Sequence, residues 1–252
     1  MVLAEIAANY NIKVIAIALS KDSLPALEPV CKKVFHFGVG QTNKILKTFK
    51  NEKVSNVVMV GKVDKRVIFQ TKIFDLRAIN VLRKMRLKDD KSLMTAVISE
   101  LQSEGINCLD QSLFLMDLLP SKGVLTKKKP SKSEWEDIKY GFSIAKEMAR
   151  LEIGQTVVVK DKSIVAVEAM EGTDQTIMRG NKLAGKGAVV VKVSRPNQDR
   201  RYDIATVGET TLSFLIKGKA STLAIDAENT LMLDKDKVIE LADKFKISIV
   251  AV

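Results

Sequence analysis

Apolar residues in the first half of the chain alternate between helical and strand spacing. Short connections separate the elements, and this alternation is typical of a parallel sheet covered by helices. Gly105 is expected to cap the last helix of this half at its C-terminus. The predicted helices are 3–10, 43–50, 71–87 and 89–104, and the predicted strands are 13–19, 33–37 and 56–60.

A break in the pattern follows at 120–130, where prolines, a glycine and three lysines interrupt any periodicity. We therefore predict an N-terminal α/β domain at 1–119 and a C-terminal α/β domain at 120–252. A long helix is expected to begin at a capping box formed by Ser133 and Glu136, with Trp135 on its core face. The later predicted strands are 156–160, 164–168, 188–193, 221–225 and 247–252, and the later predicted helices are 209–217 and 234–245.

The chain opens directly into a helix, and none of its first residues is a serine, threonine or aspartate that would cap it. In an α/β unit such a helix normally follows a strand and a turn. We therefore expect that a first strand is missing. The predicted strand at 13–19 should then have one unpaired side or an exposed apolar flank.

Composition bounds the class of protein. The 252 residues are 46% hydrophobic, which is ample for a sizeable core. Cys31 and Cys108 lack the spacing of a zinc site, so we expect two reduced, buried thiols in a cytoplasmic protein. No apolar run reaches the length of a membrane-spanning helix. The net charge of +11 favours polyanionic partners, namely nucleic acid, an anionic lipid surface or a phosphorylated substrate.

Three polar clusters in the second half follow apolar strands, where ligands collect in α/β sheets: 168–174, 192–201 and 203–208. Carboxylates beside phosphate-binding bases suit magnesium-assisted phosphoryl chemistry. Each cluster could equally be a turn with capping residues, and Asp174 could be a helix N-cap. The chain has no Walker motif, and its only histidine, His36, is predicted to be a strand residue.

The segments Leu151–Gln155, Ala166–Asp174 and Val193–Gly208 resemble the family of UDP-2,3-diacylglucosamine pyrophosphatases of the lipid A pathway. Weaker matches stand at 61–63 and 89–90, and the similarity runs in register through the chain. It implies two α/β domains with the substrate cleft between them. It also implies a first strand and a glycine-rich turn, which we expect to be missing from this chain. It also implies magnesium-dependent cleavage of UDP-2,3-diacylglucosamine to UMP and 2,3-diacylglucosamine 1-phosphate.

The resemblance assigns catalysis to Asp203, Asp174 and Lys192, with Asp203 and Asp174 also as the metal ligands. Whether Asp203 holds the metal or orients the water is left open, as is the phosphorus that is attacked. The residues implied to bind substrate are Gly61, Lys62, Gln155, Glu171, Thr173, Gln198, Arg201 and Thr206.

Glu152, Arg195, Asn197 and Ala205 depart from the family's usual residues, but they keep charge or turn character. The positive charge is expected to draw the protein to the anionic inner membrane as a peripheral enzyme. A homodimer is left open. The alternative is a basic nucleic-acid-binding module without activity, but aromatic residues make up only 5% of the chain, which disfavours it.

Overall fold

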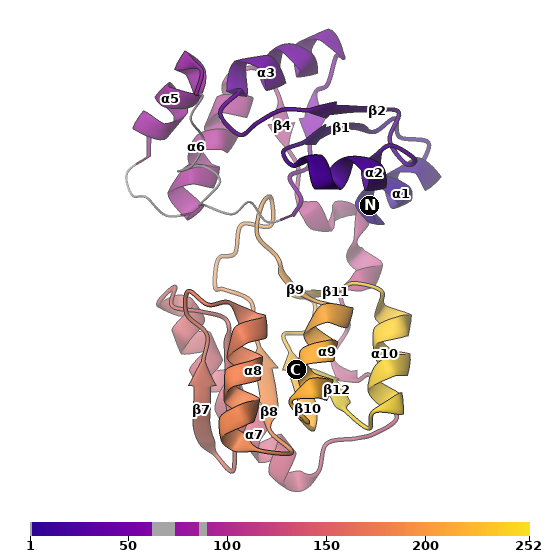
Figure 1. Cartoon of the computed structure of the whole chain (residues 1–252), viewed down its shortest axis with the longest axis vertical. Helices are drawn as coiled ribbons and strands as arrows, with labels where there is room; N and C mark the ends of the chain where they lie inside the picture. The colour runs from indigo at the N-terminus through magenta and orange to yellow at the C-terminus, as the bar shows by residue number, and fades with distance from the viewer. Residues whose placement is uncertain (1, 62–73, 86–89) are drawn as a thin grey trace. The chain divides into compact units, whose positions relative to one another are not determined.

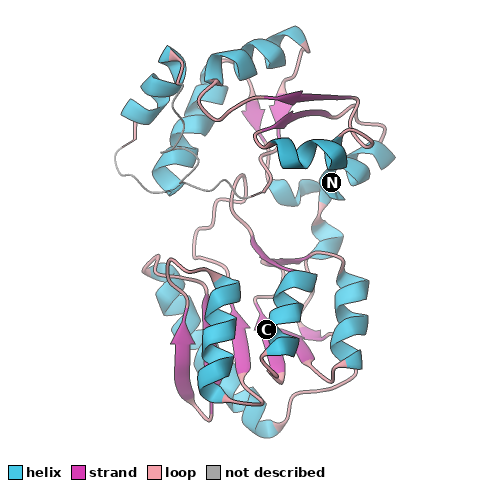
Figure 2. Cartoon of the chain, in the orientation of Figure 1, coloured by secondary structure: helices cyan, strands magenta, loops and turns pink. Residues whose placement is uncertain are grey.

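The computed structural model describes residues 2–61, 74–85 and 90–252, although not the side chain of Asp90. The chain divides into two compact units. Unit 1 comprises 1–114 together with 200–202, and unit 2 comprises 115–199 together with 203–252. The division after residue 114 lies five residues before the predicted boundary. Both units mix helices and strands, so the predicted α/β class is confirmed (Figures 1 and 2).

Unit 1 contains short parallel strand pairs flanked by helices. Strand β1 pairs with β2, and β3 pairs with β4, each pair in parallel orientation as predicted. Within the described residues β1 has a ladder partner on one side only, which agrees with the expected unpaired edge. The elements are α1 (Val2–Asn9), β1 (Ile15–Ala18), η1 (Lys21–Ser23), α2 (Leu24–Leu27), β2 (Lys33–His36), α3 (Thr42–Asn51), β3 (Asn56–Val57), α5 (Leu76–Arg83), α6 (Asp90–Ser103), β4 (Asn107–Cys108) and η2 (Gln111–Phe114).

Several local predictions for unit 1 have clear outcomes. His36 ends β2, and Gly105 follows α6 with a φ of 75°, the left-handed conformation expected of a C-cap. The strand predicted at 56–60 is shorter, because only Asn56–Val57 pairs with a neighbour. Neither Cys31 nor Cys108 is in a disulfide, and both are half-buried rather than buried as predicted. Burial raises the pKa of the Cys31 thiol.

Unit 2 is built on a six-stranded sheet with the order β5-β12-β10-β8-β6-β7. Strands β8, β10 and β12 are parallel, whereas β6 runs antiparallel to both of its neighbours, β7 and β8. A separate parallel pair joins β9 to β11. The elements are η3 (Met116–Leu118), β5 (Gly123–Val124), α7 (Lys132–Arg150), β6 (Thr156–Lys160), β7 (Ser163–Val167), α8 (Thr173–Ala184), β8 (Val189–Lys192), β9 (Ala205–Val207), α9 (Glu209–Lys217), β10 (Thr222–Ile225), β11 (Thr230–Met232), α10 (Lys235–Lys244) and β12 (Ser248–Ala251).

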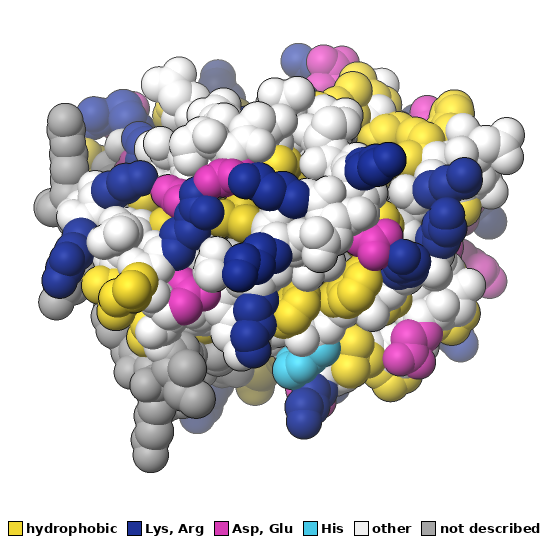
Figure 3. Space-filling model, turned by 90° about the horizontal axis from the view of Figure 1, so that it is seen from above, with side chains coloured by type: hydrophobic (Ala, Val, Ile, Leu, Met, Phe, Trp, Pro, Cys, Tyr) yellow, Lys and Arg dark blue, Asp and Glu magenta, His cyan; other side chains and the backbone are white. Residues whose placement is uncertain are grey.

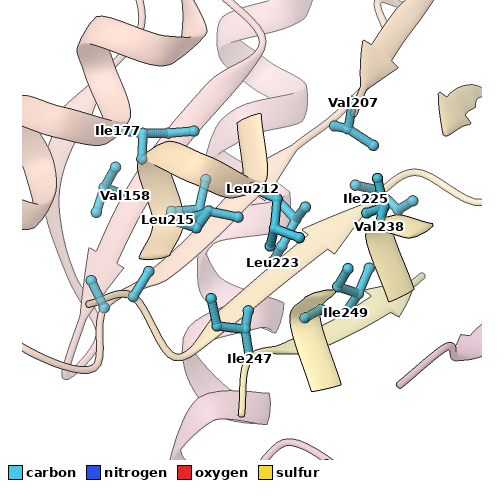
Figure 4. Packing of buried hydrophobic residues seen from close by; sticks show 14 of the residues in the cluster. Val158, Ile177, Val207, Leu212, Leu215, Leu223, Ile225, Val238, Ile247 and Ile249 are labelled. Atoms are coloured by element: carbon cyan, nitrogen blue, oxygen red, sulfur yellow. The ribbon is translucent and has the colours of Figure 1, made fainter. Parts of the chain in front are cut away.

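Alternate residues of these strands enter two apolar layers, as the twofold period of a strand requires. Val158, Leu223 and Ile249 pack with α8, α9 and α10 on one face, where Figure 4 shows them around Leu212 and Leu215. The intervening valines, among them Val157, Val191 and Val250, pack against α7 on the other face. Helix α8 lies so close to the sheet that a Cβ on Gly180 would be 2.5 Å from a methyl group of Val158. Unit 2 is therefore a sheet buried on both faces.

The start of α7 corrects two predictions. Its N-cap is Ser131, whose hydroxyl accepts from the Glu134 N–H at 3.2 Å, while Glu134 accepts from the Ser131 N–H at 2.6 Å. The capping box predicted at Ser133 and Glu136 is wrong, because the same spacing occurs two residues earlier and the helix begins there. Trp135 is not a core residue but is 41% exposed. At about 100° per residue it lies roughly a quarter turn from the centre of the stripe that buries Ile138 and Ala145.

Candidate functional site

The candidate site in unit 2 lies at the carboxyl edge of the six-stranded sheet. Strands β7, β8, β10 and β12 all end at this edge, and the antiparallel β6 begins there. Residues that follow the first four strands therefore meet residues that precede β6. The arrangement agrees with the general rule that open α/β sheets bind ligands beyond the ends of their strands.

Gln155 stands at the start of β6, between the two neighbouring strand ends. Its carbonyl accepts from the Val193 N–H at 2.9 Å, and its N–H donates to Glu168 Oε2 at 3.2 Å. Its side-chain Oε1 is buried and has no hydrogen-bond partner among the described residues. Because a buried amide oxygen without a partner is unfavourable, this atom is suited to accept a hydrogen bond from a ligand.

Glu168 connects the residues around Gln155. The Thr173 hydroxyl donates to Glu168 Oε1 at 3.0 Å, and the Thr156 hydroxyl lies 3.4 Å from that of Thr173. The structure thus brings together Gln155 and Thr173, which are two of the predicted site residues. Sequence reasoning placed Glu168 in a polar cluster but gave it no role.

Helix α8 carries Asp174 and follows Glu171. Gly172 is the N-cap, with a φ of 82°, so the alternative of Asp174 as an N-cap is wrong. Asp174 lies in the first helical turn and is half-buried. Glu171 accepts from Arg179 at 2.6 Å, and this hydrogen bond holds the pKa of Glu171 below its ordinary value. Negative charge in the first turn of a helix is also favoured by the helix dipole.

The segment between β8 and β9 carries most of the remaining predicted residues of unit 2. Lys192 ends β8 and donates from Nζ to the Thr206 carbonyl at 2.7 Å. Asp203 is half-buried and accepts at Oδ2 from Arg195 Nη1 at 2.8 Å. Arg195 Nε and Gln198 Nε2 are buried without partners in the described part of the chain. Hydrogen-bond donors on this segment are thus left available to a ligand.

Arg195 was one of the departures from the family that sequence reasoning set aside, yet it is the ionic partner of Asp203. A single sequence offers no signal for such a pair, because its members lie eight positions apart in an irregular part of the chain.

Three predicted residues belong to other parts of the chain. Arg201 is half-buried and lies in the short stretch 200–202 that is grouped with unit 1. Gly61, also in unit 1, is exposed and has a φ of 90°. Lys62 lies outside the described residues. The structure does not test the part these three residues take in a site.

A magnesium ion would need oxygen ligands here. Among the described residues no three side chains of the His, Cys, Asp and Glu types group closely enough to hold a metal ion. Magnesium is nevertheless commonly held by one or two carboxylates together with phosphate oxygens and water. Asp203, a half-buried carboxylate, fits a site of that kind. A shared metal site of Asp203 and Asp174 stays a prediction.

The same edge carries a buried cluster that sequence reasoning missed. Asp226 follows β10 and contacts Lys146 of α7 and Ser194, which stands two residues beyond β8. Asp226 was detectable, because it directly follows the predicted strand 221–225 and the strand-end rule applies to it as well.

The distribution of charge gives no stripe of the kind expected for nucleic acid on the face that Figure 3 shows. Basic side chains are spread over that face and separated by apolar, acidic and other residues. Many lysines and arginines pair with acids, for example Lys33 with Glu52 and Arg179 with Glu171. Every helix in the described part of the chain is too short or too polar to span a membrane.

Comparison with known proteins covers both units. Residues 1–118 match the family model of the LpxI N-terminal domain, and residues 121–250 match that of the LpxI C-terminal domain. The UDP-2,3-diacylglucosamine pyrophosphatase LpxI of Caulobacter vibrioides is 28% identical over 226 residues, which cover 85% of this chain and 80% of that protein.

Solved structures of Acinetobacter baumannii RibD show only a slight likeness. Forms 1 and 2 have TM-scores of 0.30 and 0.31, with 15% and 16% sequence identity. The matches cover 46% and 47% of this chain and 35% and 36% of those chains. Likeness at this level supports no argument about fold or function.

Proposed function

This chain belongs to the LpxI family, and we propose that it hydrolyses the diphosphate of UDP-2,3-diacylglucosamine in lipid A biosynthesis. The products would be UMP and 2,3-diacylglucosamine 1-phosphate. The observation that carries the proposal is the match of both family domains, which together span nearly the whole chain. The name of the Caulobacter vibrioides relative supplies the substrate.

The chemistry of the sheet edge supports a role in phosphoryl transfer. Lys192 and Arg195 bring positive charge to the segment that also carries Asp203, and Gln155 and Gln198 offer buried polar atoms without partners. A diphosphate under attack by water gains charge on its oxygens, which cations and hydrogen-bond donors stabilise. Lys192, together with Arg201, would serve this purpose.

Asp203 is the residue that we propose to be essential. Its carboxylate would bind magnesium or accept a hydrogen bond from the attacking water, and the hydrogen bond from Arg195 holds it in one orientation. Magnesium, when bound, would neutralise phosphate charge and align the diphosphate. Asp174 would be the second ligand. Glu171, Thr173, Gln198 and Thr206 would contact the substrate together with Gln155, Gly61 and Lys62.

The proposed setting is a cytoplasmic enzyme that touches the inner membrane peripherally. Its acylated substrate would reside in that membrane, and the net charge of +11 favours approach to an anionic lipid surface. The family match does not indicate a nucleic-acid partner.

The test is a single-turnover and steady-state assay with UDP-2,3-diacylglucosamine in mixed micelles, with magnesium or with EDTA. We expect release of UMP in magnesium only. Asp203→Ala should lower kcat by about a hundredfold or more while the protein stays folded, the scale of losing a group that acts in proton transfer or metal binding.

Asp236→Ala is the matched control, because Asp236 is an exposed carboxylate on α10. Reaction in ¹⁸O-labelled water would show by mass spectrometry which product gains the label, and hence which phosphorus is attacked. Turnover by Asp203→Ala at the parent rate would exclude Asp203 from the mechanism. No UMP from the parent protein would refute the proposed activity.

A further inference from the structure

A buried ionic cluster at the carboxyl edge of the sheet joins three elements of unit 2. Asp226, 6% exposed, accepts at Oδ2 from the Ser194 N–H at 3.1 Å, from the Ser194 hydroxyl and from Lys146 Nζ. Lys146 also donates to the Ser194 hydroxyl at 3.3 Å, and its Nζ lies 5.5 Å from the centre of the Phe142 ring. The cluster therefore ties α7 and the end of β10 to the chain that leaves β8.

The register of the sheet explains why these residues meet. Ile225, the last residue of β10, is the partner of Lys192, the last residue of β8. Asp226, the residue after β10, therefore lies beside the residues that follow β8. Lys146 reaches the same place from α7, the helix that covers this face of the sheet.

Stability alone is a weak reason for such a cluster. Burying a carboxylate carries a desolvation penalty, and a buried ion pair is often no more stabilising than apolar residues of similar volume. What three donors on one carboxylate oxygen do provide is a fixed position for the groups that donate to it. Two of those donors belong to Ser194, and the next residue is Arg195.

Arg195 in turn pairs with Asp203 at 2.8 Å. A continuous series of contacts thus runs from Lys146 through Asp226 and Ser194 to the ion pair of the predicted catalytic aspartate. We propose that Lys146, Asp226 and Ser194 are positioning residues, which set the orientation of the Asp203 carboxylate by fixing the start of the β8–β9 segment. The inference rests on the proposed function, and none of the three needs to touch the substrate.

A positioning role has a distinct kinetic signature. Substrate would still bind, so KM should change by no more than about twofold, whereas kcat should fall about tenfold to a hundredfold as the carboxylate loses its alignment. Conservative replacement should restore most of the rate. A variant that changes both Lys146 and Arg195 should lose less kcat than the product of the two single losses, because both residues act on the position of the same carboxylate.

The experiment compares Lys146→Met, Lys146→Arg, Asp226→Asn and Ser194→Ala, each assayed in magnesium and followed by thermal unfolding. Lys139→Met is the matched control, since Lys139 is an exposed lysine on the same helix. We expect Lys146→Met and Asp226→Asn to lose kcat, Lys146→Arg to recover it, and Lys139→Met to match the parent. Ser194→Ala keeps the backbone N–H donor, so its kcat should lie between those of the parent and Asp226→Asn. It serves as the second test if Asp226→Asn fails to fold.

Three outcomes would overturn the inference. A rise in KM with unchanged kcat would mean that Lys146 binds substrate directly. If the double variant Lys146→Met, Arg195→Met lost kcat by the product of the two single losses, the two residues would act independently. Parent-like kinetics in folded Lys146→Met and Ser194→Ala would exclude the role altogether. Each of these outcomes can be observed only if the parent protein is active. An inactive parent would refute the proposed function and is a separate result.

Discussion

The two units of this chain are stabilised in different ways. Unit 2 buries a continuous sheet between two apolar layers, with Ile177, Leu215 and Leu223 almost wholly excluded from water. Unit 1 has a small apolar cluster, whose buried members in the described residues are Leu46, Phe49, Leu101 and Ile106. Ionic contacts supplement it: Arg77 and Lys84 both pair with Glu100. Unit 2 thus has two extensive apolar layers, whereas unit 1 combines a smaller apolar cluster with charge pairs between its helices.

The difference follows from how much sheet each unit contains. A six-stranded sheet gives every central strand two faces to bury, so valine-rich strands can be apolar throughout. The strand pairs of unit 1 offer little such surface, and α3, α5 and α6 meet one another instead. Arg77 also pairs with Glu104, which in turn pairs with Lys50 of α3. Charge thus connects three helices around a modest core.

The largest expected effect is in the core of unit 2. Leu215→Ala should lower the free energy of unfolding of unit 2 by about 4–5 kcal/mol, because its neighbours are packed on all sides and cannot fill the space. Leu101→Ala in unit 1 should lower that unit's stability by about 2–3 kcal/mol. Native-state hydrogen exchange reports the two units separately. An equal or larger loss for Leu101→Ala would contradict the comparison.

Removing charge from the ionic network of unit 1 should have an intermediate effect. Glu100→Gln should destabilise unit 1 by about 1–2 kcal/mol, a value reduced from that of a buried pair because the Lys84 side chain is 53% exposed. The hydrogen bond from Arg77 lowers the pKa of Glu100. The contribution of ionised Glu100 to the stability of unit 1 should therefore be complete above the ordinary glutamate pKa. It should be lost as the pH falls through the lower pKa that Glu100 has in the folded protein.

Glu52→Gln is the control for that experiment. Glu52 pairs with Lys33, whose side chain is 48% exposed, so the change should alter stability by less than about 0.5 kcal/mol. Urea unfolding of unit 1 across pH 3 to 7 would measure both variants. A flat pH profile for the difference between the parent and Glu100→Gln would show that the network contributes nothing.

The smallest effect concerns the first turn of α7 in unit 2. Ser131→Ala should destabilise by about 1 kcal/mol, the usual loss for an N-cap, whereas Ser133→Ala should be nearly neutral. Burial opposes ionisation of Glu134, but hydrogen bonds from Ser221 and the Ser131 N–H, with the nearby Lys128 ammonium, lower its pKa to about 2. This stabilisation is present above the ordinary glutamate pKa and is lost as the pH falls towards 2.

Thermal unfolding at pH 7 and pH 3 would separate the two serines. If Ser133→Ala proved the more damaging change, the helix would begin where the sequence pattern suggested and not where the structure places it.

Much of unit 2 was predictable because its signals are local. The strands predicted at 156–160 and 221–225 and the helix predicted at 209–217 have clear signals in the sequence, and the structure has them within a residue. The start of α7 was misplaced because two overlapping Ser-x-x-Glu spacings compete, and periodicity cannot choose between them. The short strands β5, β9 and β11 were missed, since two or three residues carry no period.

The candidate site was predictable only in its location. Strand ends pointed to Lys192 and to the clusters around Asp174 and Asp203, and family resemblance supplied their roles. The partners were not predictable, because they depend on strand order. Asp226 lies 32 positions from Ser194 and 80 from Lys146, and only the adjacency of β8 and β10 brings them together.

The pairing of β5 with β12 has a consequence for how unit 2 is made. Strand β5 is the first strand of the unit to be synthesised, yet its ladder partner is the last. The residues just after β5 also depend on the end of the chain for their hydrogen bonds. The Leu125 N–H donates to the Ile249 carbonyl, and the Lys127 N–H donates to Asp243. The sheet therefore cannot be completed while the unit is still emerging from the ribosome. A nascent chain halted before residue 248 would hold β10 with an open edge, ready to bind a chaperone or another unfinished copy.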